Sequence, residues 1–234
     1  MSDSNDVRIT SDNVTAGVIG GRHNTGNVTP APAVPAPPAA VPASVGRTNR
    51  VGFVVDVVSY GQRTAVAQEH IQKRLQALLR TVIEDVGSDF DTVDRDTGTG
   101  DGMVVFLPTG SDPTRLLPDL LRATAGRLSA DNQLYRDRIR LRMAVGSGVV
   151  GRGSNGFSGP LVVNITRLVD CEPLRREAAD HPESDLVVLV LDALHRDVVG
   201  PGYLPPSVAE FRMVDVAMKE FADRAWVWRS APGI

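Results

Sequence analysis

The order of its apolar segments is the feature that most constrains the fold of this chain. Short runs rich in Val, Ile and Leu alternate with longer segments whose apolar residues recur every three or four positions. Strands are expected at residues 50–58, 92–95, 103–107, 138–148, 186–191, 211–219 and 225–228. Helices are expected at residues 64–86, 112–129, 160–176 and 192–198, with a Gly/Ser-rich loop at 151–159. This order predicts an α+β sandwich built on a ferredoxin-like βαββαβ unit.

The beginning of the chain differs in composition from the rest. Residues 1–29 are polar and rich in Gly, Asn and Thr, and we expect them to be flexible alone and to serve as a docking tag for a protein partner. Residues 30–47 contain a Pro/Ala-rich stretch, which predicts an extended linker. The globular domain is therefore expected at residues 48–230.

Bulk composition excludes several classes of protein. The chain has 234 residues, 42% of them hydrophobic, a formal net charge of −3 and one cysteine, Cys171. One cysteine excludes an internal disulfide and a cysteine-built zinc site. The charge gives no broad attraction to nucleic acid, and no apolar run approaches the ~18–20 residues that span a membrane. The N-terminus lacks a basic start followed by an apolar run, so no secretory signal is expected and the protein is predicted to be cytoplasmic.

Two aspartates lie where predicted strands meet turns. Asp56 is near the end of the strand at 50–58, and Asp101 lies between two glycines just before the strand at 103–107. Mg²⁺ and Mn²⁺ prefer oxygen ligands, often one or two carboxylates together with substrate phosphates. The pair thus indicates a metal-dependent nucleotide site if the two strands are neighbours. The alternative is that Asp56 faces solvent and Asp101 serves a hairpin turn.

Two further patterns concern strand faces. Arg136, Arg138, Arg140 and Arg142 alternate with other residues, which predicts a solvated face on the strand at 138–148. Trp226 and Trp228 share one face of the last strand, which is typical of a core or a dimer interface.

The element order and these aspartates together resemble the catalytic domain of class III nucleotidyl (adenylate/guanylate) cyclases. The resemblance covers about residues 48–229. It is carried by the motifs at residues 53–60, 100–102, 142–148, 159–168 and 216–220. The run from Arg167 to Asp170 and the later Ala-Trp-Val sequence are similar to those of small actinobacterial cyclase-homology proteins.

The resemblance implies an activity and a set of site residues. Members of the family form a 3′,5′-cyclic nucleotide and pyrophosphate from a nucleoside triphosphate, with two divalent ions (Mg²⁺ or Mn²⁺) at a homodimer interface. Asp56 and Asp101 match the metal ligands. Arg167 matches an arginine that stabilises the transition state, and Lys219 matches a lysine that binds the phosphates.

The chain also departs from the family pattern. The transition-state asparagine should lie four residues after Gly159, where this chain has Val163, so Asn164 is the nearest candidate. One step along a helix rotates a side chain by about 100°. Asn164 therefore points in the direction of the family's asparagine only if the helix start shifts.

The positions that read the base differ as well. Thr97 stands where the family has a purine-reading lysine, and Gly156 stands where its partner is expected, so the base is left open. Arg95 and Asp96 flank the same hairpin and are candidate substitutes. These departures keep an alternative open, in which the domain is catalytically degenerate and acts as a nucleotide-binding or protein-interaction regulatory module.

Overall fold

The structure is a computed structural model that describes residues 46–97, 100–154, 156–218 and 221–231. The predicted tag at 1–29 and most of the predicted linker lie outside these residues. Within the described residues, no helix is long and apolar enough to cross a membrane.

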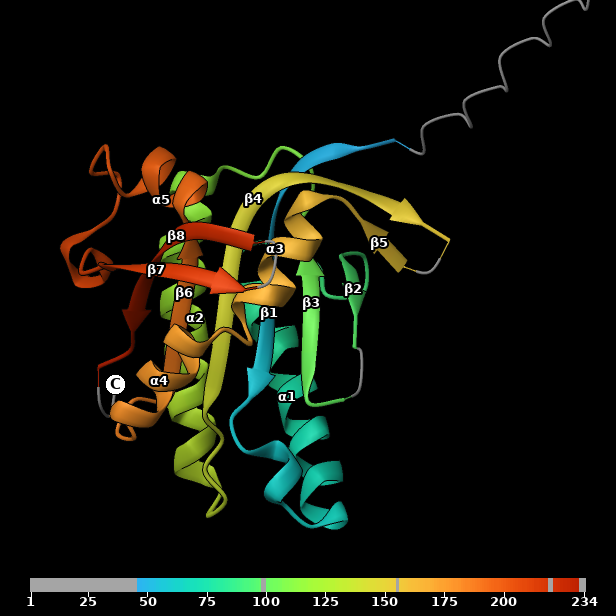
Figure 1. The fold of residues 1–234 in the computed structure, drawn as a ribbon. Coiled ribbons are helices and arrows are strands. Elements are labelled where there is room, and N and C mark those ends of the chain that lie inside the picture. Colours follow the sequence, from blue (N-terminus) through green and yellow to red (C-terminus); the bar gives the residue numbers. More distant parts are fainter. Residues whose placement is uncertain (1–45, 98–99, 155, 219–220, 232–234) are drawn as a thin grey trace, which may run out of the picture. The chain divides into compact units, whose positions relative to one another are not determined.

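The described residues form an eight-stranded mixed sheet (Figure 1). Its order is β2-β3-β1-β4-β6-β8-β7, and β5 pairs with β4 off this path. The β4–β6 pair is parallel and the other pairs are antiparallel. The strands are β1 (Thr48–Val57), β2 (Asp94–Asp96), β3 (Gly102–Phe106), β4 (Leu141–Gly153), β5 (Gly156–Ser158), β6 (Leu186–Leu191), β7 (Arg212–Met218) and β8 (Phe221–Arg229).

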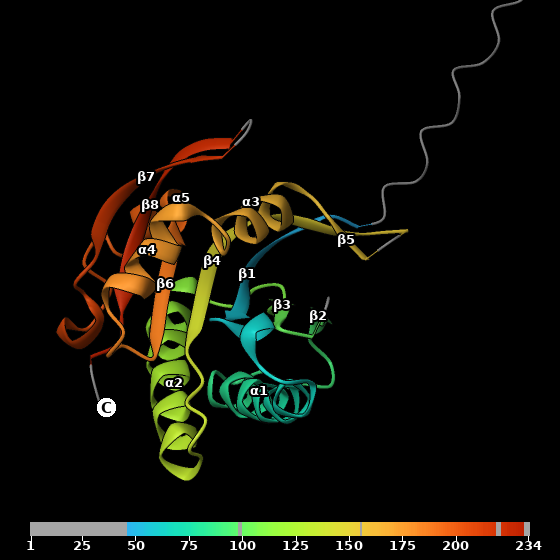
Figure 2. The same ribbon diagram turned by 60° about the horizontal axis from the view of Figure 1, so that its bottom comes forward.

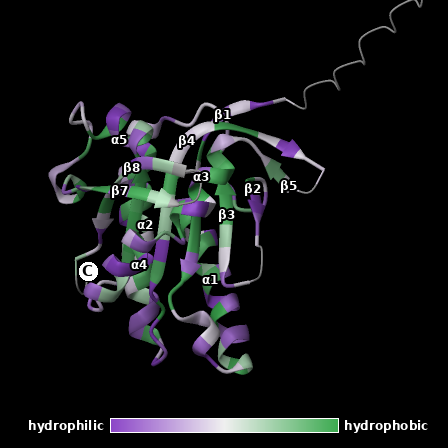
Figure 3. Ribbon diagram, in the orientation of Figure 1, coloured by the Kyte–Doolittle hydropathy of each residue, from purple (hydrophilic) through white to green (hydrophobic). Residues whose placement is uncertain are grey.

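Helices cover both faces of this sheet, as Figure 2 shows. The helices are α1 (Ala65–Asp85), α2 (Pro113–Leu134), α3 (Pro160–Leu168), α4 (Glu172–Asp180) and α5 (Asp192–Val198), with short 3₁₀ turns at Tyr60–Gln62 and Pro206–Val208. One core lies between the sheet and α1 and α2, and a second lies under α3 and α4. Hydrophobic residues are concentrated in the central strands (Figure 3). The predicted α+β sandwich is therefore confirmed.

Strand β1 shows how the two cores are separated. Phe53 and Val55 belong to the α1/α2 core, whereas Val54 belongs to the α3/α4 core. Because successive strand side chains point to opposite faces, Asp56 lies on the α3/α4 face with Val54. This alternation places the Asp56 carboxylate near the end of β1, at the edge of the α3/α4 core.

Capping residues set the starts of the two long helices. The Thr64 side chain accepts a hydrogen bond from the Ala67 amide at 3.3 Å, and Asp112 accepts one from the Thr114 amide at 2.9 Å. Pro113 is tolerated at the first turn because its missing amide would have no helical partner. Helix α2 then continues to Leu134, beyond the predicted end at residue 129.

The predicted loop at 151–159 is wrong, because β4 continues to Gly153 and forms a hairpin with β5. The Phe157 ring packs against Phe106, with centroids 4.8 Å apart, and Arg152 pairs with Asp94 of β2. These contacts hold the hairpin to the rest of the sheet.

The predicted helix at 160–176 is also wrong, because it is divided into α3 and α4. Cys171 adopts an extended conformation with ψ 152°, and Pro173 lies in the first turn of α4. Proline lacks an amide hydrogen and crowds the preceding turn, so it disfavours one continuous helix here and is tolerated in the first turn of α4.

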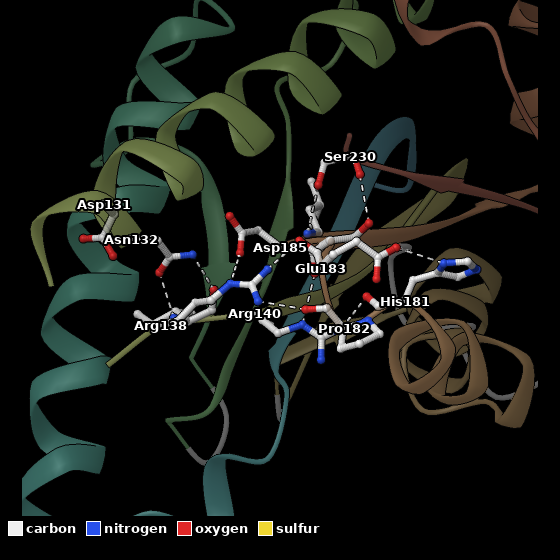
Figure 4. A network of polar contacts seen from close by, with 12 residues as sticks. Asp131, Asn132, Arg138, Arg140, His181, Pro182, Glu183, Asp185 and Ser230 are labelled. Carbon is white, nitrogen blue, oxygen red and sulfur yellow. Dashed lines mark hydrogen bonds and ion pairs between the residues drawn. The ribbon is translucent and has the colours of Figure 1, made fainter. Parts of the chain in front are cut away.

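Arg136 and Arg138 are exposed, as predicted, but the predicted solvated arginine face is wrong for Arg140 and Arg142, which are half-buried. Arg140 donates hydrogen bonds to the carbonyls of Ser184 at 3.0 Å and His181 at 2.9 Å, and burial lowers the pKa of its guanidinium. Arg138 binds the carbonyls of the same turn and the carboxylate of Asp185 (Figure 4). The two arginines therefore tie the segment before β4 to the end of α4, where carbonyls carry negative partial charge.

The tryptophans of β8 pack within the chain. Trp228 is buried in the α1/α2 core. The Trp226 ring stacks on His195 with centroids 3.6 Å apart and donates a hydrogen bond to Asp192 at 3.0 Å. The predicted core position is therefore confirmed for Trp228, whereas Trp226 is partly buried and packs against the same core.

Candidate functional site

The two predicted metal aspartates lie at adjacent strand ends. In the register of the sheet, Asp56 of β1 is opposite Gly102 of β3, the residue that directly follows Asp101. The Val57 amide donates a hydrogen bond to the Asp101 carbonyl at 2.9 Å, which closes the end of this ladder. A Cβ atom at Gly102 would lie 2.4 Å from the Val55 carbonyl oxygen, so a glycine is required for this approach.

Arg142 is the partner of Asp56 on the other side. Its Nε lies 3.1 Å from Oδ2 of Asp56, and its Nη2 also contacts that oxygen. The Asp56 and Arg142 side chains are only 20% and 13% exposed. Asp56 therefore does not face solvent, as the simpler alternative would require.

Several charges act on the Asp56 carboxyl. Burial raises its pKa, and the hydrogen bond and charge of Arg142 offset part of this increase. The negative charges of Asp101 and Asp170 raise the pKa further. A site that concentrates carboxylates in this way is poised to accept a cation.

This pKa shift predicts how stability depends on pH. Because the pKa of Asp56 is higher in the folded protein, its stabilising contribution is present below the unfolded pKa and is lost as pH rises through the folded pKa. We expect Asp56→Asn, which mimics the neutral carboxyl and leaves Asp170 as the anion 3.6 Å from Arg142, to raise the Tm at pH 7.5, and this gain to shrink as pH falls toward 4. Thermal unfolding of both proteins at the two pH values checks this. A lower Tm at pH 7.5 would mean that the ion pair with Arg142 outweighs burial.

The donor set fits a hard cation that binds together with a substrate. Among the described residues, no group of three or more His, Cys, Asp or Glu side chains is arranged to hold a metal ion. Two carboxylates, from Asp56 and Asp101, suffice for Mg²⁺ or Mn²⁺ when phosphate oxygens complete the coordination. The residues present therefore suit a metal–nucleotide complex.

Helix α3 carries the predicted catalytic residues over the same face. It packs on β1 and β4, and its buried residues are Leu161, Ile165 and Leu168. Asn164 and Arg167 are half-buried and three residues apart, so they lie on the same side of the helix. Val163, in the family's asparagine position, is 42% exposed.

The start of α3 is fixed by Gly159. This residue has φ 125°, and a Cβ atom there would lie 2.5 Å from the Val149 carbonyl oxygen. The first helical hydrogen bond runs from the Val163 amide to the Gly159 carbonyl at 3.4 Å. The helix therefore begins at Pro160, as the sequence predicts, and not one residue later.

The base-reading positions come together at the end of β2. A Cβ atom at Gly156 would lie 3.6 Å from Oδ2 of Asp96, the neighbour of Thr97. Arg95 points elsewhere, since its guanidinium lies 4.2 Å from the centre of the Phe90 ring and donates to the Phe90 carbonyl. Of the two predicted substitutes, Asp96 is thus the one beside Gly156.

Two charged residues of this region were not predicted from the sequence to belong to the site. Arg142 was interpreted as part of a solvated face, and Asp170, at the junction of α3 and α4, was given no role. The feature that could have identified Arg142 is its position on a strand that runs beside the strand of Asp56. Lys219, predicted to bind phosphates, lies outside the described residues, between β7 and β8 in sequence.

A separate pocket of about 890 Å³ lies away from these aspartates. Val208, Phe211 and Trp228 form part of its apolar lining. Glu177 at its edge is held by Arg229 at 3.0 Å and by a close contact with Arg212. None of the carboxylates around Asp56 lines this pocket, so it does not belong to the candidate site.

Comparison with known proteins identifies the fold. No protein-family model and no curated protein sequence matches the chain. Among solved structures, the guanylyl cyclase Cya2 is 14% identical with a TM-score of 0.53, over 79% of this chain and 92% of that chain. The adenylate/guanylate cyclase/hydrolase from Silicibacter pomeroyi is 17% identical with a TM-score of 0.53, over 78% of this chain and 97% of that chain.

A third solved structure agrees with these two. The catalytic core of a rhodopsin-guanylyl cyclase with converted specificity, in complex with ATPαS, is 10% identical with a TM-score of 0.54, over 80% of this chain and 98% of that chain. The domain therefore has the fold of the class III adenylate/guanylate cyclase catalytic domain. The predicted similarity to actinobacterial members stays a prediction.

Proposed function

We propose that this protein is a class III nucleotidyl cyclase that converts a nucleoside triphosphate into a 3′,5′-cyclic nucleotide and pyrophosphate. The observation that carries this proposal is the position of Asp56 and Asp101 at adjacent strand ends, on a sheet with the cyclase fold. In the reaction the ribose 3′-oxygen attacks the α-phosphorus, the hydroxyl proton leaves, and the bond to the β-phosphate oxygen breaks.

Each predicted site residue has a separate role in this reaction. Asp56 and Asp101 would hold Mg²⁺ or Mn²⁺, whose charge activates the 3′-hydroxyl and neutralises the triphosphate. Arg167 is placed to stabilise negative charge that develops on the transferred phosphate, and Lys219 to bind the phosphates. Because α3 begins at Pro160, Asn164 does not occupy the family's asparagine position, and we propose it as the amide donor because it lies beside Arg167 on the same side of the helix.

The site is proposed to form between two copies of the chain. A twofold-symmetric homodimer gives two equivalent sites. Each site would combine the metal aspartates of one protomer with Arg167 and Lys219 of its partner. We further propose that the protein is cytoplasmic and that residues 1–29 dock a protein partner through the linker at 30–47, with residues 48–230 as the cyclase domain.

A second candidate function is a regulatory module that binds a nucleotide or a protein without turnover. Val163 in the asparagine position favours this alternative, because a valine offers no hydrogen-bond donor. The ion pair between Arg142 and Asp56 favours it too, since it engages a predicted metal ligand.

The test of activity also identifies the base. The purified dimer is incubated with Mn²⁺ or Mg²⁺ and each of ATP, GTP, CTP and UTP, and cyclic products are measured by mass spectrometry. We expect GTP to be preferred about tenfold or more, because the Asp96 carboxylate only accepts hydrogen bonds and guanine offers two adjacent N–H donors. Adenine offers one donor beside an acceptor.

The variant Asp96→Asn is expected to remove most of this preference for GTP. Asp91→Asn is the matched control. Asp91 is an exposed aspartate that pairs with Arg80 and lies in the segment just before β2, the first strand of the same hairpin. An unchanged ratio of kcat/KM values in Asp96→Asn contradicts the role of Asp96. No cyclic product from any nucleotide, in a dimeric preparation, supports the regulatory module.

The amide donor is tested on neighbouring positions of α3. Asn164→Ala is expected to lower kcat about tenfold, the scale of one lost transition-state hydrogen bond. Val163→Ala is the control, because it removes no polar group. Unchanged turnover in Asn164→Ala, with higher turnover in Val163→Asn, would place the donor position at 163 instead.

A further inference from the structure

We propose that Asp170 is a positioning residue for Arg142. When a divalent cation binds to Asp56, the Arg142 guanidinium moves from Asp56 to Asp170. Arg142 would then act as a movable counterion for the site. The proposal rests on the proposed function only in requiring that Asp56 binds a cation.

Arg142 belongs to a row of side chains of alternating charge, which consists of Asp56, Arg142, Asp170 and Arg175. Nη2 of Arg142 contacts Oδ2 of Asp56 and lies 3.6 Å from Oδ1 of Asp170. Nη2 of Arg175 lies 2.9 Å from the same Asp170 oxygen. Arg142 is therefore between two carboxylates that come from different elements, the end of β1 and the junction of α3 and α4.

Competition for one oxygen makes Arg142 responsive to a metal ion. Both contacts of Arg142 with Asp56 use Oδ2, an oxygen that a bound cation would need. A cation at that position would repel the guanidinium at close range. The Arg142 side chain is only 13% exposed, so it cannot withdraw into water, and a buried guanidinium without an anion is strongly destabilising.

Asp170 is the nearest carboxylate that can receive it. Because β4 is paired with β1 and β6 at this level, the backbone of Arg142 is fixed and only its side chain can turn. Asp170 is 52% exposed, and its bond to Arg175 leaves acceptor capacity on the carboxylate. A small rotation of the guanidinium would thus exchange Asp56 for Asp170 as its main partner.

The first experiment measures Mn²⁺ binding to the full chain by electron paramagnetic resonance of the free ion, in the presence of a 3′-deoxynucleoside triphosphate, which supplies phosphate oxygens but cannot cyclise. A sample without protein gives the Mn²⁺ that the nucleotide binds alone. Asp170→Asn is expected to raise the Kd for Mn²⁺ about three- to tenfold, because Arg142 then stays on Asp56. Glu172→Gln is the matched control, since it removes one carboxylate that pairs with Arg176 on the same segment. Its Kd is expected to equal that of the wild type.

A double-mutant cycle separates this mechanism from simple attraction of the cation by Asp170. In an Arg142→Met background, Asp170→Asn is expected to leave the Kd for Mn²⁺ unchanged, because the residue that Asp170 positions has been removed. An equal loss of affinity in both backgrounds overturns the proposal. Arg142→Gln is the second background if the methionine variant does not fold.

A spectroscopic measurement on the wild type reports Arg142 directly. Diamagnetic Mg²⁺ is expected to shift the ¹⁵N–¹H signal of Arg142 Nε, and the end point of this shift is expected to change in Asp170→Asn. A resonance that does not move while Mg²⁺ binds contradicts the exchange of partners. Failure of the proposed function looks different, since Mn²⁺ would then bind neither the wild type nor Asp56→Asn.

Discussion

Asp56→Asn is expected to lower the kcat of cyclic-nucleotide formation by about 10²–10³-fold or more. An amide oxygen is neutral, so it cannot replace a carboxylate that holds a divalent ion against the repulsion of Arg142. Asp101→Asn is expected to have a similar effect, because the two side chains lie at adjacent strand ends. Initial rates at saturating nucleotide and Mn²⁺, with the product measured by mass spectrometry, test both variants.

The matched control is Asp131→Asn. Asp131 forms an ion pair with Arg74 whose side chains are 16% and 4% exposed, a burial similar to that of the Asp56–Arg142 pair. This pair joins α1 and α2 on the opposite face of the sheet. We expect the control to retain turnover at temperatures well below its Tm. Equal losses in the Asp56 and Asp131 variants would attribute the effect to stability instead of metal binding.

Mixing two inactive variants is expected to restore about one quarter of the wild-type activity. Arg167→Ala alone is expected to lose about 100-fold in kcat, because it removes a cation from the developing charge. When it is mixed with Asp56→Asn under conditions of subunit exchange, half of the dimers carry one protomer of each kind. Each mixed dimer has both substitutions in one site and leaves the other intact, so about one site in four is active.

The control for this experiment is a mixture of Asp56→Asn and Asp101→Asn. Both substitutions affect the metal half of the site, so each site of a mixed dimer contains one defect and no activity returns. Analytical ultracentrifugation verifies that every variant dimerises. An absence of rescue with Arg167→Ala, in mixtures shown to contain mixed dimers, would place the whole site within one chain.

The parts of the fold that follow from local chemistry could be predicted from the sequence. The apolar run of β1 and the capping residues Thr64 and Asp112 fix elements through neighbours in the sequence. Asp56 and Asp101 were identified for the same reason, since each marks the boundary between a strand and a turn.

The pairing of Arg142 with Asp56 could not be predicted in this way. It depends on the register between β1 and β4, and a slip of one residue would place Arg142 on the opposite face. The β4–β5 hairpin also escaped prediction, because it is held by contacts of Arg152 and Phe157 with distant residues. Asp170 became relevant only once the break between α3 and α4 was known.

The glycine at the start of α3 has a consequence for how this domain can diverge. Gly159 is fixed by its positive φ and by the Val149 backbone, so the phase of the helix is set by the main chain and not by the residues that the helix displays. Exposed positions such as Val163 can therefore change identity without rotating Arg167 away from its place. In such a scaffold, catalytic capacity can be lost or regained by exchanging single side chains while the architecture stays the same.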